Sequence, residues 1–196
     1  MRSWDTANKA SELSDFSVCT SWGIRGKGRY LLHVLRKRMG YPELKRAVRE
    51  QREAFEASVV LIEDKASGTQ LIQELIQEGL LAVTRYQPQS DKIMRMHAQT
   101  AMIENGFVHL PKEAAWLAEY LHKLTAFPKG KHDDQVDSTA QMLDWFKQAR
   151  SGPAPTPGSG SCIKERYEAQ QAAASQPARP EPLSVMAKRL GLLRSL

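Results

Sequence analysis

The chain contains few cysteines and no long apolar runs, and both shortages narrow the classes of protein it could be. Its two cysteines, Cys19 and Cys162, lie in different regions and form no metal-binding or redox motif, which makes a reducing compartment the default. No apolar run is long enough to span a membrane, and the N-terminus has no signal-peptide hydrophobic region. We therefore expect a cytoplasmic protein with no membrane partner.

What the chain does contain is typical of a soluble folded domain with a basic balance. Of its 196 residues, 41% are hydrophobic and 26% are charged, and the net charge is +6. Residues 1–150 hold 22 basic and 19 acidic side chains, whereas residues 151–196 hold 6 and 3. The C-terminal part is therefore more basic per residue. This balance permits a polyanionic partner without requiring one.

Periodicity predicts an α/β fold for residues 1–150, with a mixed sheet flanked by helices. The apolar run at 59–62 is typical of a buried central strand. Further strands are expected at 1–5, 15–22, 30–35, 81–86 and 107–110, with a glycine-rich turn at 23–28. Helices are expected at 42–55, 69–78, 91–104, 112–125 and from Asp133 to about Arg150.

The composition changes at residue 151. Residues 151–196 begin with a Ser-, Gly- and Pro-rich linker and continue as a Pro-, Ala- and Gln-rich tail that we expect to be flexible. Within it, residues 183–193 could form a short amphipathic helix. Because so short a helix is marginal alone, we interpret it as a contact for a partner protein or as a disordered end without function.

Three acidic residues, Asp133, Asp134 and Asp137, begin the last predicted helix, directly after Pro128 and Gly130. Acids at a helix start are ordinarily capping groups that complement the helix dipole. Two further acids follow predicted strands: Asp5 ends the first, and Glu63 ends the apolar run. This recurrence of acids at element ends favours a shared site over simple capping.

These acids could meet at one edge of the sheet. If the first and fourth strands are neighbours, Asp5 and Glu63 project from the same edge, and the last helix can bring its acids there. Crowded carboxylates repel one another unless a cation neutralises them, and all-oxygen ligation suits Mg²⁺ or Mn²⁺. Two such ions can clamp the attacking and leaving oxygens of a phosphodiester. The residues therefore indicate metal-dependent phosphodiester hydrolysis.

Five motifs, in order, resemble the nuclease domain of the large terminase subunit of tailed bacteriophages. They are Ser-Trp-Asp-Thr-Ala at 3–7, Asp-Phe-Ser-Val at 15–18, Ile-Glu-Asp-Lys-Ala-Ser-Gly at 62–68, Asp-Lys-Ile-Met-Arg at 91–95 and His-Asp-Asp-Gln-Val-Asp at 132–137. The resemblance implies a ribonuclease H-like fold that cuts concatemeric double-stranded DNA in the host cytoplasm during genome packaging, with two Mg²⁺ or Mn²⁺ ions. It also implies a terminase small subunit, a packaging ATPase and a portal protein as partners.

The resemblance also assigns residues. Asp5 and Glu63 match the two strand acids, and the helix acid falls on Asp133 or Asp134, so the expected catalytic set is Asp5, Glu63 and Asp134. The expected metal ligands are Asp5, Glu63, Asp133 and Asp134, with Asp137 as a third helix candidate, while Asp64 could exchange roles with Glu63. Lys92 and Arg95 match the DNA-facing basic pair, although a solvated helix face would show the same spacing.

The chain departs from the family in having no Gly-x-x-x-x-Gly-Lys-Ser/Thr loop, so the packaging ATPase is not encoded in it. We expect an excised domain, a split gene product or a remnant. Two alternative functions stay open at this point. One is a junction resolvase or transposase-like nuclease of the same fold, and the other is a catalytically inactive module that binds the packaging machinery or portal.

Overall fold

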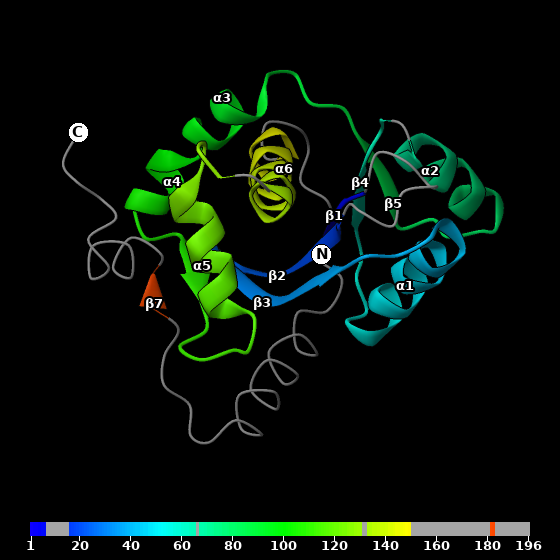
Figure 1. The fold of residues 1–196 in the computed structure, drawn as a ribbon, viewed down its shortest axis with the longest axis horizontal. Coiled ribbons are helices and arrows are strands. Elements are labelled where there is room, and N and C mark those ends of the chain that lie inside the picture. The colour runs from blue at the N-terminus through cyan, green and yellow to red at the C-terminus, as the bar shows by residue number, and fades with distance from the viewer. Residues whose placement is uncertain (7–15, 66, 131–132, 150–180, 183–196) are drawn as a thin grey trace.

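A mixed β-sheet runs through the centre of the computed structural model, which describes residues 1–6, 16–65, 67–130, 133–149 and 181–182 (Figure 1). The strand order is β5-β4-β1-β2-β3-β6-β7. β1 pairs in parallel with β4 and antiparallel with β2, which confirms that the first and fourth strands are neighbours. The strands are β1 (Arg2–Asp5), β2 (Ser17–Arg25), β3 (Gly28–Lys37), β4 (Val60–Glu63), β5 (Val83–Tyr86), β6 (Val108–Leu110) and β7 (Glu181–Pro182).

Helices cover both faces of this sheet, and Figure 1 shows α1 and α2 grouped apart from the other four. One buried cluster, centred on Trp4 and Ile62, packs against α1 (Tyr41–Ala54) and α2 (Ser67–Gln77). The second, centred on Leu61 and Trp22, packs against α5 and α6. The helices on this second face are α3 (Lys92–His97), α4 (Thr100–Glu104), α5 (Leu117–Ala126) and α6 (Asp134–Ala149).

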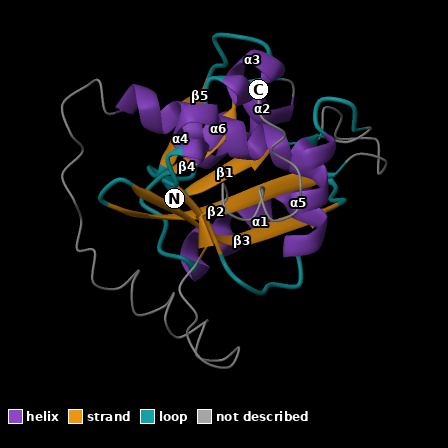
Figure 2. Cartoon of the chain, turned by 90° about the vertical axis from the view of Figure 1, so that its left-hand side faces the viewer, coloured by secondary structure: helices purple, strands orange, loops and turns teal. Residues whose placement is uncertain are grey.

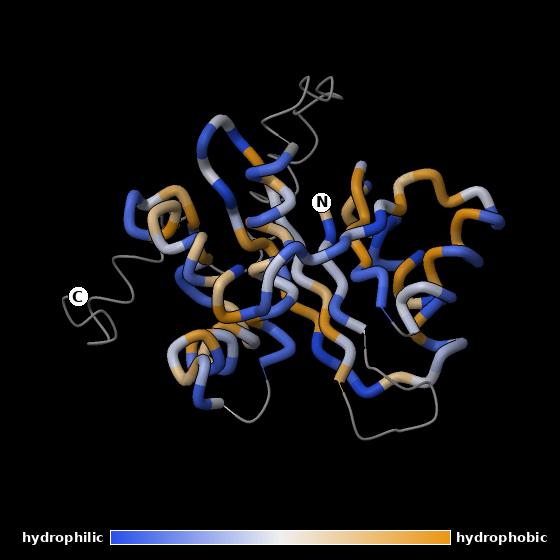
Figure 3. The backbone as a smooth tube through the Cα atoms, turned by 90° about the horizontal axis from the view of Figure 1, so that it is seen from above, coloured by the Kyte–Doolittle hydropathy of each residue, from blue (hydrophilic) through white to orange (hydrophobic). Residues whose placement is uncertain are grey.

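The division into two faces follows from the alternation of side chains along each strand. In β4, Leu61 belongs to the second cluster, while Val60 and Ile62 on either side belong to the first. Along the helices, hydrophobic and hydrophilic residues alternate (Figure 3), as expected for elements with one face on a core. The predicted α/β architecture, with a sheet between helical layers, is confirmed (Figure 2).

Sequence predictions of element bounds are wrong at the hairpin turn and in two of the helices. The hairpin turn predicted at 23–28 is much tighter, because Gly23 and Ile24 pair with β3 and leave a turn at Gly26 and Lys27. Gly26 adopts φ +58°, which glycine tolerates without strain. The helix predicted at 91–104 is broken between α3 and α4, where Gln99 donates its backbone N–H to the carbonyl of Met96 in a tighter i→i−3 turn.

The helix predicted at 112–125 also starts late, at Leu117, because the residues after Pro111 form turns before it. Most of the predicted tail, including the helix suggested at 183–193, lies outside the described residues. The exception is the pair 181–182, which forms β7 against His109 and Leu110 and thereby joins the sheet. None of the helices in the described part of the chain has the length and apolarity needed to cross a membrane.

Candidate active site

The pairing of β1 with β4 determines where the first two acids lie. Trp4 is opposite Ile62 in the parallel register, so the next residues, Asp5 and Glu63, leave the same edge of the sheet. Trp4 and Ile62 both face α1 and α2. Because side chains alternate along a strand, Asp5 and Glu63 point to the other face, which α6 covers. The two acids therefore project together beneath α6.

A polar seam fixes the first turns of α6 on the sheet. The Ser3 hydroxyl donates to the Ser138 carbonyl (2.8 Å), and the Ser138 hydroxyl donates to the Ser3 carbonyl (2.7 Å). The Thr20 hydroxyl lies 2.8 Å from the Ser138 hydroxyl and completes the seam across β1 and β2. All three residues are buried. Because these side chains are small, the helix approaches the strands closely, and the acids that flank Ser138 in α6 lie over Asp5.

Asp5 is the electrostatic centre of the site. Burial raises its pKa well above the usual range, and the charges of four other carboxylates raise it further, in decreasing order Asp137, Glu63, Asp134 and Asp133. Burial likewise raises the pKa of Asp137, where the Asp133 charge adds to the effect and Lys92 opposes it. Glu63 and the three acids at the start of α6 thus all act on Asp5. Asp137, the third candidate in the sequence, exerts the strongest charge effect on Asp5.

Three cations offset this negative charge. Arg36, at the end of β3, donates from Nε to Oδ2 of Asp134 (2.7 Å). Lys92 forms an ion pair with Asp133 and lies 3.6 Å from Asp137, and Arg95 lies 3.2 Å from Asp137. Arg95 is only 7% exposed, so a solvated helix face does not describe it, whereas Lys92 is 46% exposed. The predicted DNA-facing pair therefore lies against the acids of α6.

The loop after β4 separates Glu63 from its neighbour Asp64. Asp64 bonds to Thr69 and pairs with Arg85 (3.2 Å), and these contacts lower its pKa. The charge of Glu63, in contrast, contributes to the raised pKa of Asp5. This division favours Glu63 over Asp64 as the strand acid of the site.

Gly68 allows α2 to start immediately beside Glu63. An added Cβ at this position would lie 2.1 Å from the Glu63 carbonyl oxygen, so every other residue would force the end of β4 to move. The Gly68 N–H donates to the Lys65 carbonyl (2.9 Å), which closes the turn between β4 and α2. Gly68 therefore positions Glu63 through the backbone.

The donor set fits hard divalent cations in its chemistry. All the clustered acids offer oxygen ligands, and the buried Oδ1 of Asp134 has no hydrogen-bond partner among the described residues. As the side chains are placed, however, no three His, Cys, Asp or Glu residues in the described ranges are arranged to hold one ion. Asp133, just before α6, and Asp134 and Asp137 within it instead pair with Arg36, Lys92 and Arg95.

Sequence reasoning missed two parts of this site. Arg36 lies on the same cross-strand row as Asp5, through Val18, but only the strand register reveals this. The Ser3–Ser138 seam joins positions 135 residues apart, and isolated serines give no signal of such a bond. His132, the first residue of the fifth motif, lies outside the described residues.

Comparison with known proteins agrees with the five motifs. No curated protein matches the chain. The family profile of the terminase RNaseH-like domain matches residues 2–144, which is well over half of the sequence and includes every acid of the cluster. The sheet order, the α6 placement and this match lead to one conclusion: the chain belongs to the terminase RNaseH-like domain family.

Proposed function

We propose that this protein is a metal-dependent endonuclease that hydrolyses phosphodiester bonds of double-stranded DNA during viral genome packaging. The observation that carries the proposal is that Asp5 and Glu63 leave the same edge of the sheet beneath the start of α6, where the charges of four carboxylates raise the pKa of the half-buried Asp5. Arg36, Lys92 and Arg95 compensate the acids at the start of α6, whereas Asp5 and Glu63 form no ion pair within the described part of the chain, so a bound cation would relieve the repulsion that remains between them. Membership of the terminase RNaseH-like family supports the same chemistry.

Asp5 and Glu63 would hold the ions from the sheet, and Asp134, with Asp133 and Asp137 beside it, would hold them from α6. Mg²⁺ or Mn²⁺, as a pair, would supply the Lewis acidity that generates the nucleophile and stabilises the leaving oxygen. The protein's part is to keep these acids on the sheet edge and the first turn of α6. The Oδ1 atom of Asp134, which has no hydrogen-bond partner within the described ranges, is the atom that we assign first to this role.

The DNA would be held mainly through its phosphates, with little reading of sequence. Lys92 suits this role because it is exposed, and phosphate could replace Asp133 as its partner once ions neutralise the acids. Arg95 is buried against Asp137, so we assign it chiefly to positioning that acid. A small subunit, a packaging ATPase and a portal protein in the host cytoplasm are the partners that this function would involve.

A plasmid-cleavage assay with Mg²⁺, Mn²⁺ or EDTA tests the proposal. Asp5→Asn and Glu63→Gln are expected to lower the cleavage rate on the order of a hundredfold or more. Asp64→Asn is the matched control, because Asp64 pairs with Arg85 beside the cluster, and this variant should keep cleaving. Cleavage that persists in EDTA, or full activity in folded Asp5→Asn, would contradict the assignment. DNA binding without cleavage in either metal would favour an inactive packaging module.

A further inference from the structure

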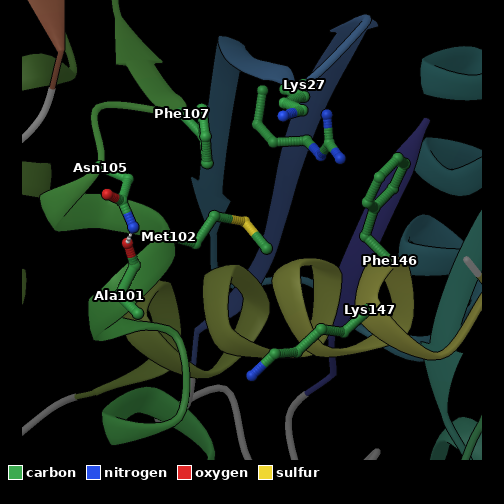
Figure 4. A pocket seen from close by; sticks show the side chains of 8 residues that line it. Lys27, Ala101, Met102, Asn105, Phe107, Phe146 and Lys147 are labelled. Carbon is green, nitrogen blue, oxygen red and sulfur yellow. Dashed lines mark hydrogen bonds between the residues drawn. The ribbon is translucent and has the colours of Figure 1, made fainter.

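A second site lies at the opposite end of α6 from the acids. It is a pocket of about 360 Å³ between the β2–β3 turn, α4, the start of β6 and the last turns of α6 (Figure 4). Phe146 is twelve residues beyond Asp134, which places the pocket roughly 18 Å along the helix from the acid cluster. Its lining residues are Lys27, Arg29, Ala101, Met102, Asn105, Phe107, Phe146 and Lys147.

The pocket combines an apolar floor with cationic groups and has no acidic lining residue. Met102 and Phe107 point into it in Figure 4, and Phe146 lies across from them. Lys27 lies over the Phe107 ring (5.9 Å to the centroid), and the buried Arg29 lies over the Phe146 ring (3.4 Å). Within the described part of the chain, Lys27 forms no ion pair with a carboxylate, which contrasts with Lys92 at the acid cluster.

The lining distinguishes between classes of occupant. A nucleobase has polar edges that need hydrogen-bond partners when buried. The one neutral polar side chain of the lining, Asn105, already donates from Nδ2 to the Ala101 carbonyl (2.7 Å). In addition, cations cover one face of each phenylalanine ring. A hydrocarbon side chain needs no such partners, and carboxylates beside it would complement the lysines at the rim.

We propose that this pocket docks a partner protein through a segment that carries one large apolar side chain between acidic residues. The apolar side chain would fill the space beside Met102 and Phe107. One flanking carboxylate would pair with Lys27, and the other with Lys147, whose ammonium also donates to the Ala98 carbonyl (2.8 Å). Because the pocket lies at the far end of α6, such a partner would leave the acid cluster accessible to DNA. The proposal is independent of the nuclease activity.

The test is an amide NMR titration of the full 196-residue chain with a short peptide that has one phenylalanine between two pairs of glutamates. The expected chemical-shift changes centre on Ala101, Asn105 and Phe107. Replacing the peptide's phenylalanine by alanine should weaken binding about tenfold or more, because it removes the buried ring. No binding at millimolar peptide, or equal binding of the alanine peptide, would overturn the proposal.

Two protein variants locate the binding. Lys27→Glu should lower the affinity for the phenylalanine peptide about fivefold or more. Arg25→Glu changes an exposed residue outside the lining and should alter this affinity less than about twofold. Ala101→Trp should abolish binding by filling the pocket and leaves Lys27 in place. Equal effects of the two charge reversals would mean non-specific attraction.

Other occupants give distinct results that would also overturn the proposal. A thymidine oligonucleotide that produces the same shift changes at lower concentration would identify a nucleic-acid site. Concentration-dependent self-association that Lys27→Glu removes, measured by sedimentation, would identify a second copy of this chain. Plasmid cleavage by Lys27→Glu should equal that of the wild-type protein, so a failed docking test and a failed nuclease test remain distinguishable.

Discussion

Replacing Asp5 by asparagine should make the metal-free protein more stable while removing its proposed catalytic acid. Asp5 is half-buried, and the loss of solvent together with the charges of Asp137, Glu63, Asp134 and Asp133 raises its pKa. Asparagine has nearly the same shape but no charge, so the repulsion within the cluster falls. From the usual cost of a poorly compensated buried group, the gain in unfolding free energy is on the order of 1–2 kcal/mol. For a domain of this size that corresponds to about 2–8 °C in Tm.

The same substitution should change how stability depends on pH. A carboxyl whose pKa is raised in the folded state binds its proton more tightly there than in the unfolded chain. The wild-type protein in EDTA should therefore lose stability as pH rises from about 4, the ordinary pKa of Asp, through the raised value. Asp5→Asn lacks this loss. The difference between the two proteins should be small at acidic pH and largest at high pH.

Thermal unfolding in EDTA and in Mg²⁺ measures both effects. Mg²⁺ should raise the Tm of the wild-type protein, because a free Mg²⁺ concentration of a hundred times the Kd stabilises the folded state by about 2.7 kcal/mol. The Tm of Asp5→Asn should rise much less. Asp64→Asn is the control of opposite sign, because the lowered pKa of Asp64 reflects favourable contacts in the folded state. If Asp5→Asn is less stable than the wild-type protein in EDTA at neutral pH, the interpretation of Asp5 as a repelled carboxylate is wrong.

Three further predictions follow from the surroundings of the cluster. Replacing both Lys92 and Arg95 by alanine should weaken DNA binding equally across sequences and reduce its salt dependence. Filter binding at several salt concentrations measures this, and an unchanged slope of log affinity against log salt concentration would contradict it. Gly68→Ala should impair cleavage more than Gly130→Ala, because only the former meets the Glu63 carbonyl, and equal plasmid-cleavage rates would refute the positioning role. Deleting residues 151–196 should leave cleavage of naked DNA intact and should lower the free energy of unfolding by at most about 1 kcal/mol, because it removes only the short β7 pairing from the described fold. If circular dichroism shows that the truncated protein is unfolded, the predicted domain boundary at residue 150 is wrong.

The parts of the fold that could be predicted from the sequence are those with a strong local pattern. The bounds of β4 and α2 were predicted to within two residues. A strand buried on both faces has a continuous apolar run, and the φ of +84° at Gly79, where α2 has ended, favours glycine. The break at Gln99 could not be predicted. Residues 91–104 have helical spacing throughout, and the tighter turn there accompanies a buried glutamine whose amide bonds to the Arg95 carbonyl.

The site was predictable where an acid followed a strand and unpredictable where a contact crosses the sheet. Asp5 and Glu63 needed only the hypothesis that β1 and β4 are neighbours, which the register confirms. The partners of the acids needed tertiary information. Arg36 is nearly a hundred residues from Asp134, and the burial of Arg95 depends on how α3 packs on α6. The metal-binding and catalytic roles of the acids themselves stay predictions.

The reciprocal serine bonds between β1 and α6 have an evolutionary consequence. Each hydroxyl donates to the other residue's carbonyl, so losing either one removes one of the two buried bonds that hold α6 on β1. A larger side chain at either position would push the helix away from the strands, and with it the acids over Asp5. Ser3 and Ser138 are therefore expected to vary as a coupled pair, in which a change at one is tolerated only after a matching change at the other.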